Sequence, residues 1–130
     1  MLQPQDIIGT YYDALYRGDL NAVKACMTEV SYFMTLESFG LRLSFRDDAF
    51  KSLLHKVQED DAALKEVEAL LSEDLLSREY TPKIEIQNIE ENGDKRLTIY
   101  YTENEKPKRL YFSKEDNGWK INYYAGRKVA

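Results

Sequence analysis

Apolar and polar residues alternate almost without interruption over residues 80–126. Successive side chains of a β-strand point to opposite faces, so this alternation predicts strands with one apolar and one polar face. Turn sequences divide the stretch at Asn92-Gly93, at Glu103 to Lys106 and at Asn117-Gly118. An Asn-Gly pair between alternating segments favours a hairpin, because both central residues of a type I′ turn need positive φ. The pattern therefore predicts an antiparallel meander of four strands.

The three turns also predict which residues face one another. With two-residue loops at the Asn-Gly pairs and a four-residue turn at 103–106, the facing pairs are Ile86 with Ile99, Phe112 with Tyr123, Ile99 with Leu110, and Leu97 with Phe112. The same apolar side chains then share one face: Ile84, Ile86, Leu97, Ile99, Tyr101, Leu110, Phe112, Trp119, Ile121 and Tyr123. A register shift of one residue would expose this whole set to water, so the agreement of the turns supports the meander.

The chain before the sheet follows a helical period, and its helix ends are marked in the sequence. Pro4 suits a first turn, Gly18 suits the left-handed end of that helix, and Asp19 suits the cap of the next. The acidic pairs Asp47-Asp48 and Asp60-Asp61 suit the starts of two further helices.

A run of helices followed by a run of strands indicates one α+β domain over 1–130. We expect N-terminal helices over 1–79 to pack on a four-stranded antiparallel meander over 80–126. The alternation from Phe39 to Phe45 predicts a short strand at 39–45 within the helical part, and 30–37 is ambiguous.

Two segments resemble the nuclear transport factor 2-like superfamily. Residues 11–23 (YYDALYRGDLNAV) are similar to its opening helices, and residues 117–121 (NGWKI) are similar to its last strand. The resemblance covers about residues 4–27 and 80–126. It implies a cone-like curved sheet around the helices, a pocket at the wide end, and dimerisation through the sheets.

The middle of the chain departs from the catalytic members of that superfamily, such as ketosteroid isomerases and scytalone dehydratases. These relatives place a short strand with acidic or aromatic residues soon after the second helix. Residues 30–45 give no clear match to that strand, and 47–79 insert two acidic helices. The resemblance therefore carries no catalytic residue into this sequence.

Charge and cysteine content limit the partners. The net charge is −5, and residues 47–79 carry ten acidic against four basic side chains. An acidic chain without a basic cluster argues against duplex nucleic acid as a partner. The lone Cys26, the lack of a signal-peptide pattern and the lack of a membrane-length apolar run favour a cytoplasmic protein away from membranes.

Two side chains are candidates for catalysis. His55 is the single histidine and would suit a general acid or base, but a solvated position on a helix is the favoured explanation. Asp13 lies among tyrosines, where a carboxylate and a tyrosine could stabilise an enolate, but the helical spacing of Ile8, Tyr12 and Leu15 favours a solvent-facing Asp13. Helix capping explains the acidic pairs, and no metal or cofactor motif is present.

Arg42 and Arg46 are candidates for anion binding. On the expected strand they lie opposite Leu41, Leu43 and Phe45, where they would receive a carboxylate or phosphate at the mouth of the cone. The favoured interpretation is an edge strand protected by charge.

The surplus of aromatic residues suggests a small-molecule pocket, because apolar concavities are the usual ligand sites. Its expected lining is aromatic: Tyr12, Phe33, Tyr101, Phe112 and Trp119. The favoured function is a non-catalytic module that binds a small apolar molecule or another protein, without a cofactor. The alternative is an isomerase or dehydratase using Asp13 or His55.

The polar face of the predicted sheet carries three tyrosines. In the expected register Tyr111 lies opposite Tyr124, and Tyr100 lies diagonal to Tyr111. Aromatic side chains surrounded by polar groups favour a homodimer through this face. Two alternatives are stacking of single-stranded RNA and an ordinary exposed strand surface.

Overall fold

Five helices precede four strands in the computed structural model, which describes residues 3–125. The helices are α1 (Pro4–Tyr16), α2 (Leu20–Ala25), α3 (Glu29–Arg46), α4 (Asp48–Leu54) and α5 (Asp61–Ser77). The strands are β1 (Ile84–Glu91), β2 (Arg96–Glu103), β3 (Lys106–Glu115) and β4 (Gly118–Ile121). They form an open antiparallel sheet in the order β1-β2-β3-β4, which confirms the α+β fold class.

Most helix ends follow the sequence signals. Gly18 has φ +72°, and Asp19 accepts a hydrogen bond from the backbone N–H of Ala22 at the start of α2. Asp47 and Asp60 cap α4 and α5 through backbone N–H groups of the first turn. Each carboxylate satisfies donors that have no partner within the helix.

Residues 39–45 are helical, so the predicted strand there is wrong. They form the second half of α3, which Thr28 begins by accepting a hydrogen bond from the N–H of Ser31. Tyr32, Leu36 and Gly40 are buried one turn apart along the inner side of α3. This period of about four residues extends over the whole segment, whereas the period-2 alternation is short, and short apolar runs fit both patterns.

The register agrees with the prediction at the middle turn and differs at the outer two. Ile99 pairs with Leu110 and Leu97 with Phe112, as expected. Asn104 and Glu105 form this two-residue loop with φ +51° and +71°, so the pair of positive φ values occurs here rather than at an Asn-Gly pair.

At the outer turns the pairing is shifted, by two residues at Ile86 and at Phe112 and by three residues from Asn88 to Glu91. Ile86 pairs with Tyr101 because β1 has an irregularity between Ile86 and Asn88 and the loop before β2 is longer than two residues. Phe112 pairs with Ile121, since the last loop is Asp116-Asn117. A shift of two keeps each side chain on its face, so the predicted apolar set still points to the inner side. Ile86 is nevertheless 40% exposed, because it lies on the edge strand β1. The shift of three beyond Ile86 places Ile89, which was not in that set, opposite Ile99.

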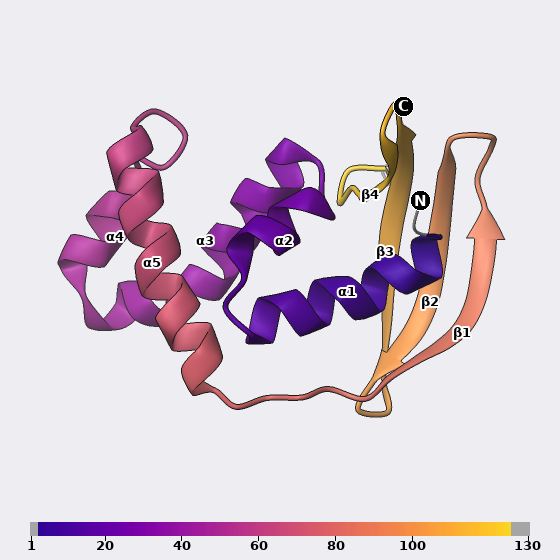
Figure 1. Ribbon diagram of the computed structural model, residues 1–130, viewed down its shortest axis with the longest axis horizontal. Coiled ribbons are helices and arrows are strands. Elements are labelled where there is room, and N and C mark those ends of the chain that lie inside the picture. Colours follow the sequence, from indigo (N-terminus) through magenta and orange to yellow (C-terminus); the bar gives the residue numbers. More distant parts are fainter. Residues whose placement is uncertain (1–2, 126–130) are drawn as a thin grey trace.

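The inner face of the sheet is covered by α1, and the helices lie to one side of the sheet (Figure 1). Ile8 and Leu15 of α1 are fully buried with Ile99 and Phe112 of the sheet. The end of α2 joins β4 through two backbone bonds, from Thr28 N to Ile121 O and from Ile121 N to Cys26 O. We call α1, α2 and the sheet the sheet half of the molecule.

The other three helices, α3, α4 and α5, form the helical half (Figure 1). Leu71 and Leu75 of α5 belong to the main core, while Phe50, Leu54, Val57 and Val67 form a smaller second core. An extended segment leads from α5 to β1 (Figure 1). Among residues 3–125, no helix is both long enough and apolar enough to cross a bilayer.

Candidate functional site

Three arginines surround one hollow in the helical half. Arg42 and Arg46 are one turn apart on α3, and Arg78 follows the last residue of α5. The hollow has a volume of about 590 Å³ and is lined by Ser38, Phe39, Leu41, Arg42, Phe45, Arg46 and Arg78. We call it the arginine groove. The helix therefore brings together Arg42 and Arg46, as predicted, but places Leu41 and Phe45 beside them rather than opposite.

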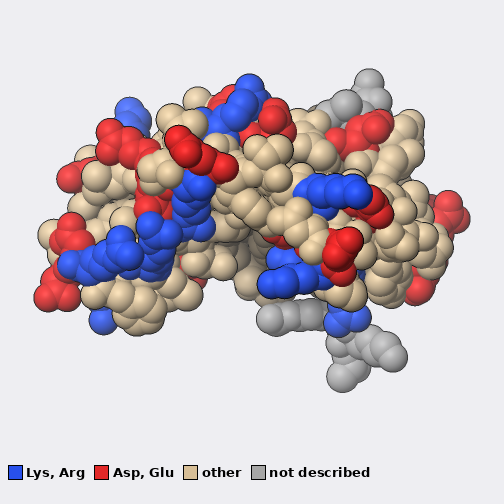
Figure 2. Space-filling model, turned by 90° about the horizontal axis from the view of Figure 1, so that it is seen from below, with Lys and Arg blue, Asp and Glu red and all other residues tan. Residues whose placement is uncertain are grey.

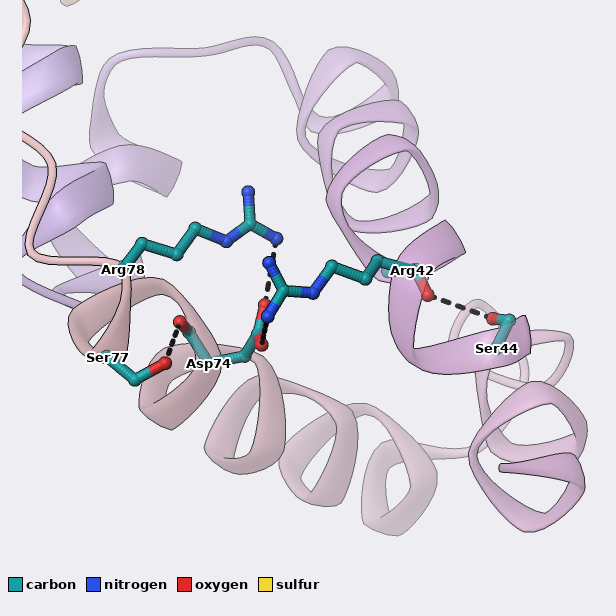
Figure 3. Close-up of polar contacts among 6 residues, drawn as sticks. Arg42, Ser44, Asp74, Ser77 and Arg78 are labelled. Carbon is teal, nitrogen blue, oxygen red and sulfur yellow. Dashed lines mark hydrogen bonds and ion pairs between the residues drawn. The ribbon is translucent and has the colours of Figure 1, made fainter. Parts of the chain in front are cut away.

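Asp74 of α5 fixes two of these arginines. Its Oδ2 lies 2.8 Å from Nη2 of Arg78, and its Oδ1 lies 3.6 Å from Nη2 of Arg42. Figure 3 shows both guanidinium groups reaching this carboxylate from α5 and α3. Among the described residues, Arg46 forms no ion pair. One carboxylate thus pairs with two of the three cations, so the lining of the groove carries an excess of positive charge.

Arg78 is the most enclosed of the three. Its side chain is 22% exposed, and its guanidinium Cζ lies 5.8 Å from the centre of the Phe39 ring. Its Nε is the one buried side-chain nitrogen or oxygen atom among residues 3–125 that has no hydrogen-bond partner. Burying a donor without an acceptor costs free energy.

Apolar side chains project beside the arginines. Phe45 is 85% exposed and Leu41, one turn earlier, is 54% exposed. On the other side of this ridge lies a second hollow of about 410 Å³, lined by Glu37, Leu41, Ser44, Phe45, Lys51, Leu54 and His55. Single exposed apolar residues are ordinary, but two adjacent ones between hollows indicate a contact surface.

The charge of this surface contrasts with that of the chain. The lining of the arginine groove contains three basic residues and no acidic one, although the whole chain carries −5. Seen from below, basic side chains form a stripe across the helical half, with acidic side chains along its edges (Figure 2). Such a local field attracts anionic groups and repels cationic ones.

A second cluster of polar groups lies inside the sheet half. The hydroxyls of Tyr12 and Tyr101 are 2.7 Å apart, and the hydroxyl of Tyr80 donates to Oε2 of Glu103 at 2.6 Å. Lys108 Nζ lies 3.0 Å from the other carboxylate oxygen of Glu103. Burial alone would raise the pKa of Glu103, but hydrogen bonds from Tyr80, Lys108 and Tyr12 outweigh it and hold the pKa below its usual value.

The hydrogen bonds that lower the pKa of Glu103 have the opposite effect on the tyrosines that donate them. The hydrogen bond to Glu103 is the main cause that raises the pKa of Tyr80 to about 12. Burial raises the pKa of Tyr101 to about 12 and raises that of Tyr12 further. All these hydroxyls are therefore neutral donors at physiological pH, and their partners satisfy them.

The five predicted pocket residues do not line one cavity. Tyr12 and Tyr101 are hydrogen-bonded to each other, and Phe112 is fully buried in the main core. Trp119 and Cys26 line a hollow of about 300 Å³. Phe33, a residue of α3, packs against both cores. Tyr12 also lines another hollow of about 300 Å³, between α1 and residues 80–84. A small-molecule ligand stays a prediction.

The two catalytic candidates lie in different hollows. Asp13 lies at the hollow between α1 and 80–84, where its carboxylate is 3.0 Å from Nε of Arg17 and 67% exposed. His55 is exposed at the end of α4 and lines the hollow on the far side of Phe45. A role for either in catalysis stays a prediction. Within residues 3–125, no group of three or more His, Cys, Asp or Glu side chains is placed to hold a metal ion.

The outer face of the sheet keeps two of its three predicted tyrosines together. Tyr100 pairs with Arg109 and so lies diagonal to Tyr111, as expected. Asn122, whose N–H donates to the carbonyl of Tyr111, occupies the place predicted for Tyr124. Tyr124 lies beyond the end of β4 because the last loop is one residue earlier than expected.

Compared with known protein families, with characterised proteins and with solved structures, the chain shows no significant match. The resemblance to the nuclear transport factor 2-like superfamily therefore stays a prediction.

Sequence reasoning missed Arg78, Phe39, Leu41 and Phe45 as parts of the site. The missing step was the helical reading of 39–45, which places Leu41, Arg42, Phe45 and Arg46 on adjoining sides of one helix. Thr28, a good capping residue followed by buried residues one turn apart, was the signal for it.

Proposed function

We propose that this protein is a non-catalytic binding module that recognises an anionic group attached to an apolar one in the arginine groove. The observation that carries the proposal is the presence of three guanidinium groups around a hollow whose other walls include Phe39, Leu41 and Phe45. Arginine offers a planar fork of donors that fits carboxylates and phosphates.

The groove is suited to an anion because its charges are not balanced internally. Asp74 neutralises only part of the charge of Arg42 and Arg78, and Arg46 forms no ion pair among the described residues. An anion entering the groove gains charge-assisted hydrogen bonds, while its apolar part covers Phe45 and Leu41.

The experiment compares three small probes by titration calorimetry and by NMR of the intact chain. Decanoate carries both features, acetate carries the charge alone, and decyltrimethylammonium carries the alkyl chain with the opposite charge. Decanoate should bind more tightly than both and shift the amide signals of residues 38–46 and 78.

The matched variants separate the groove from general surface charge. Arg42→Glu combined with Arg46→Glu should weaken decanoate binding about tenfold or more. Arg96→Glu combined with Arg109→Glu, on the exposed outer side of the sheet, should leave it unchanged. If both double variants bind decanoate with the same affinity, the proposal is contradicted.

A homodimer through the outer sheet face is a second candidate. It is favoured by Tyr111, which is only half-buried and has the guanidinium of Arg109 5.6 Å from its ring centre. Tyr111→Ser should then convert a dimer to a monomer in light scattering while the fold is retained. A native chain that is monomeric at micromolar concentration rules this candidate out.

A further inference from the structure

A stripe of three apolar residues and one serine follows the outside of α3, away from its buried side. Its positions are Met34, Ser38, Leu41 and Phe45, with spacings of four, three and four residues. Met34 is half-buried, Ser38 is exposed, and Leu41 and Phe45 are the exposed ridge beside the arginine groove. This spacing is that of the a and d positions through which one helix packs on another. We call these four residues the outer seam of α3.

From this seam we infer that the occupant of the arginine groove is an amphipathic helix of a partner protein, carrying carboxylates along one flank. The inference rests on the proposed function, because it names the molecule that supplies the anionic and apolar groups.

The hollows beside the seam fit a helix. The arginine groove lies on one flank of Leu41 and Phe45, and the hollow with Lys51 and His55 lies on the other. A ridge of side chains between two hollows is the surface that helices present to one another when ridges pack into grooves. A docked helix would cover Leu41 and Phe45, which the chain itself leaves in water.

Charge determines which flank of the partner carries its carboxylates. Arg42, Arg46 and Arg78 all lie on one side of the seam, so a glutamate or aspartate of the partner there would form paired, charge-assisted hydrogen bonds. The other flank carries both signs, since Glu37 and Lys51 line the same hollow. The arginine flank therefore selects partners by charge, and the seam supplies apolar contact.

A second copy of this chain is a poorer occupant in an antiparallel arrangement. A two-fold axis would bring the same flank of each α3 together, so the arginines of one copy would face those of the other. Like charges in contact oppose association. An acidic partner helix meets no such repulsion.

The test uses labelled three-heptad peptides and the intact chain, with fluorescence anisotropy as the readout. The first peptide has Leu at positions a and d and Glu at e and g. The second has Lys in place of Glu. The third has the composition of the first, with its Leu residues scrambled. The Glu peptide should bind about tenfold or more tightly than either control and should gain helicity, measured by circular dichroism.

Charge reversal gives the sharpest comparison. Arg42→Glu with Arg46→Glu should weaken the Glu peptide about tenfold and strengthen the Lys peptide by a similar factor. Phe45→Ser should weaken binding of the Glu peptide, and the chain should still prefer the Glu peptide to the Lys peptide. Arg96→Glu with Arg109→Glu should leave the affinity for each peptide unchanged. Reversal of preference is a result that damage to the fold would not produce.

Several outcomes would overturn the inference. Decanoate binding without Glu-peptide binding would leave the proposed function standing and refute the helical partner. If the native chain binds neither decanoate nor the Glu peptide, both the proposed function and the helical partner are refuted. A native dimer that Phe45→Ser dissociates would assign the seam to a second copy. Binding of phosphatidylglycerol vesicles in place of the peptide, abolished by Phe45→Ser, would assign it to a membrane surface.

Discussion

Both halves of the molecule bury large aromatic residues, including Phe50 of the helical half, but Phe45 of the helical half stays in water. In the sheet half, Phe112 is fully buried, and Tyr12 and Tyr101 are buried and share a hydrogen bond. In the helical half, Phe45 is 85% exposed at the edge of a groove lined by three arginines. The buried aromatic side chains stabilise the fold, whereas Phe45, which is exposed, adds little to its stability. A large apolar side chain that does not stabilise its own chain is a candidate for contact with another molecule.

The same substitution in each half tests this contrast most strongly. Phe112→Ala should lower the free energy of unfolding by about 3–5 kcal/mol, because it leaves a cavity in the main core. Urea unfolding followed by circular dichroism measures this loss. A loss below about 1 kcal/mol would mean that the sheet half does not carry the stability assigned to it.

A substitution at Gly18, where the two halves meet, should lower the free energy of unfolding nearly as much. Gly18 has φ +72°, and a Cβ there would lie 2.7 Å from the backbone oxygen of Ser72 on α5. Gly18→Ala should therefore cost about 2 kcal/mol or more, from the left-handed conformation and the clash together. Thermal unfolding measures the cost. Gly9→Ala is the matched control, since a Cβ at Gly9 meets no atom within 4 Å, and it should be neutral or stabilising.

The buried carboxylate of the sheet half gives a prediction that depends on pH. The pKa of Glu103 in the folded protein is below its usual value, so the ionised group stabilises the fold above the usual pKa of glutamate. This contribution is lost as the pH falls through the folded-state pKa. Glu103→Gln should cost about 1–3 kcal/mol at neutral pH, and the difference from the native chain should shrink in acid.

The comparison is made by urea unfolding at neutral and acidic pH. Tyr80→Phe, which removes the hydroxyl that donates to Glu103, should show the same trend with a smaller magnitude. A difference between Glu103→Gln and the native chain that stays constant with pH would contradict the assigned ionisation.

The smallest effect on stability should come from Phe45→Ala. Because Phe45 is 85% exposed, its truncation should change the free energy of unfolding by no more than about 0.5 kcal/mol. The same urea measurement that is used for Phe112→Ala checks this value. A loss of several kcal/mol would mean that Phe45 packs against its own chain in solution, and the contrast between the halves would fail.

Sequence patterns predicted the sheet half better than the helical half. The apolar set of the sheet survived two wrong turn assignments, because the pairing of its members moved by two residues and a strand repeats its faces every two. Ile86 was the exception, since a sequence pattern identifies the inner face of a strand but not how far a covering helix extends over it. Next to the first turn the pairing moved by three, and Ile89, which was left out of the set, lies opposite Ile99.

The site in the helical half was predicted only in part. Arg42 and Arg46 were identified as a pair, and they remain neighbours because residues four apart meet on a helix. Leu41 and Phe45 were placed on the wrong side, since 39–45 was interpreted as a strand. Arg78 joins the site through the packing of α5 against α3, a long-range contact that no local pattern encodes.

The most direct test of the contrast between the halves is an NMR titration of the intact chain with the Glu peptide. The account predicts that the largest shift changes occur at Leu41, Phe45, Arg46 and Arg78, with the signals of Tyr101 and Phe112 unmoved. Changes centred on the sheet, at Tyr100 and Tyr111 or around Trp119, with the arginine groove unaffected, would contradict it.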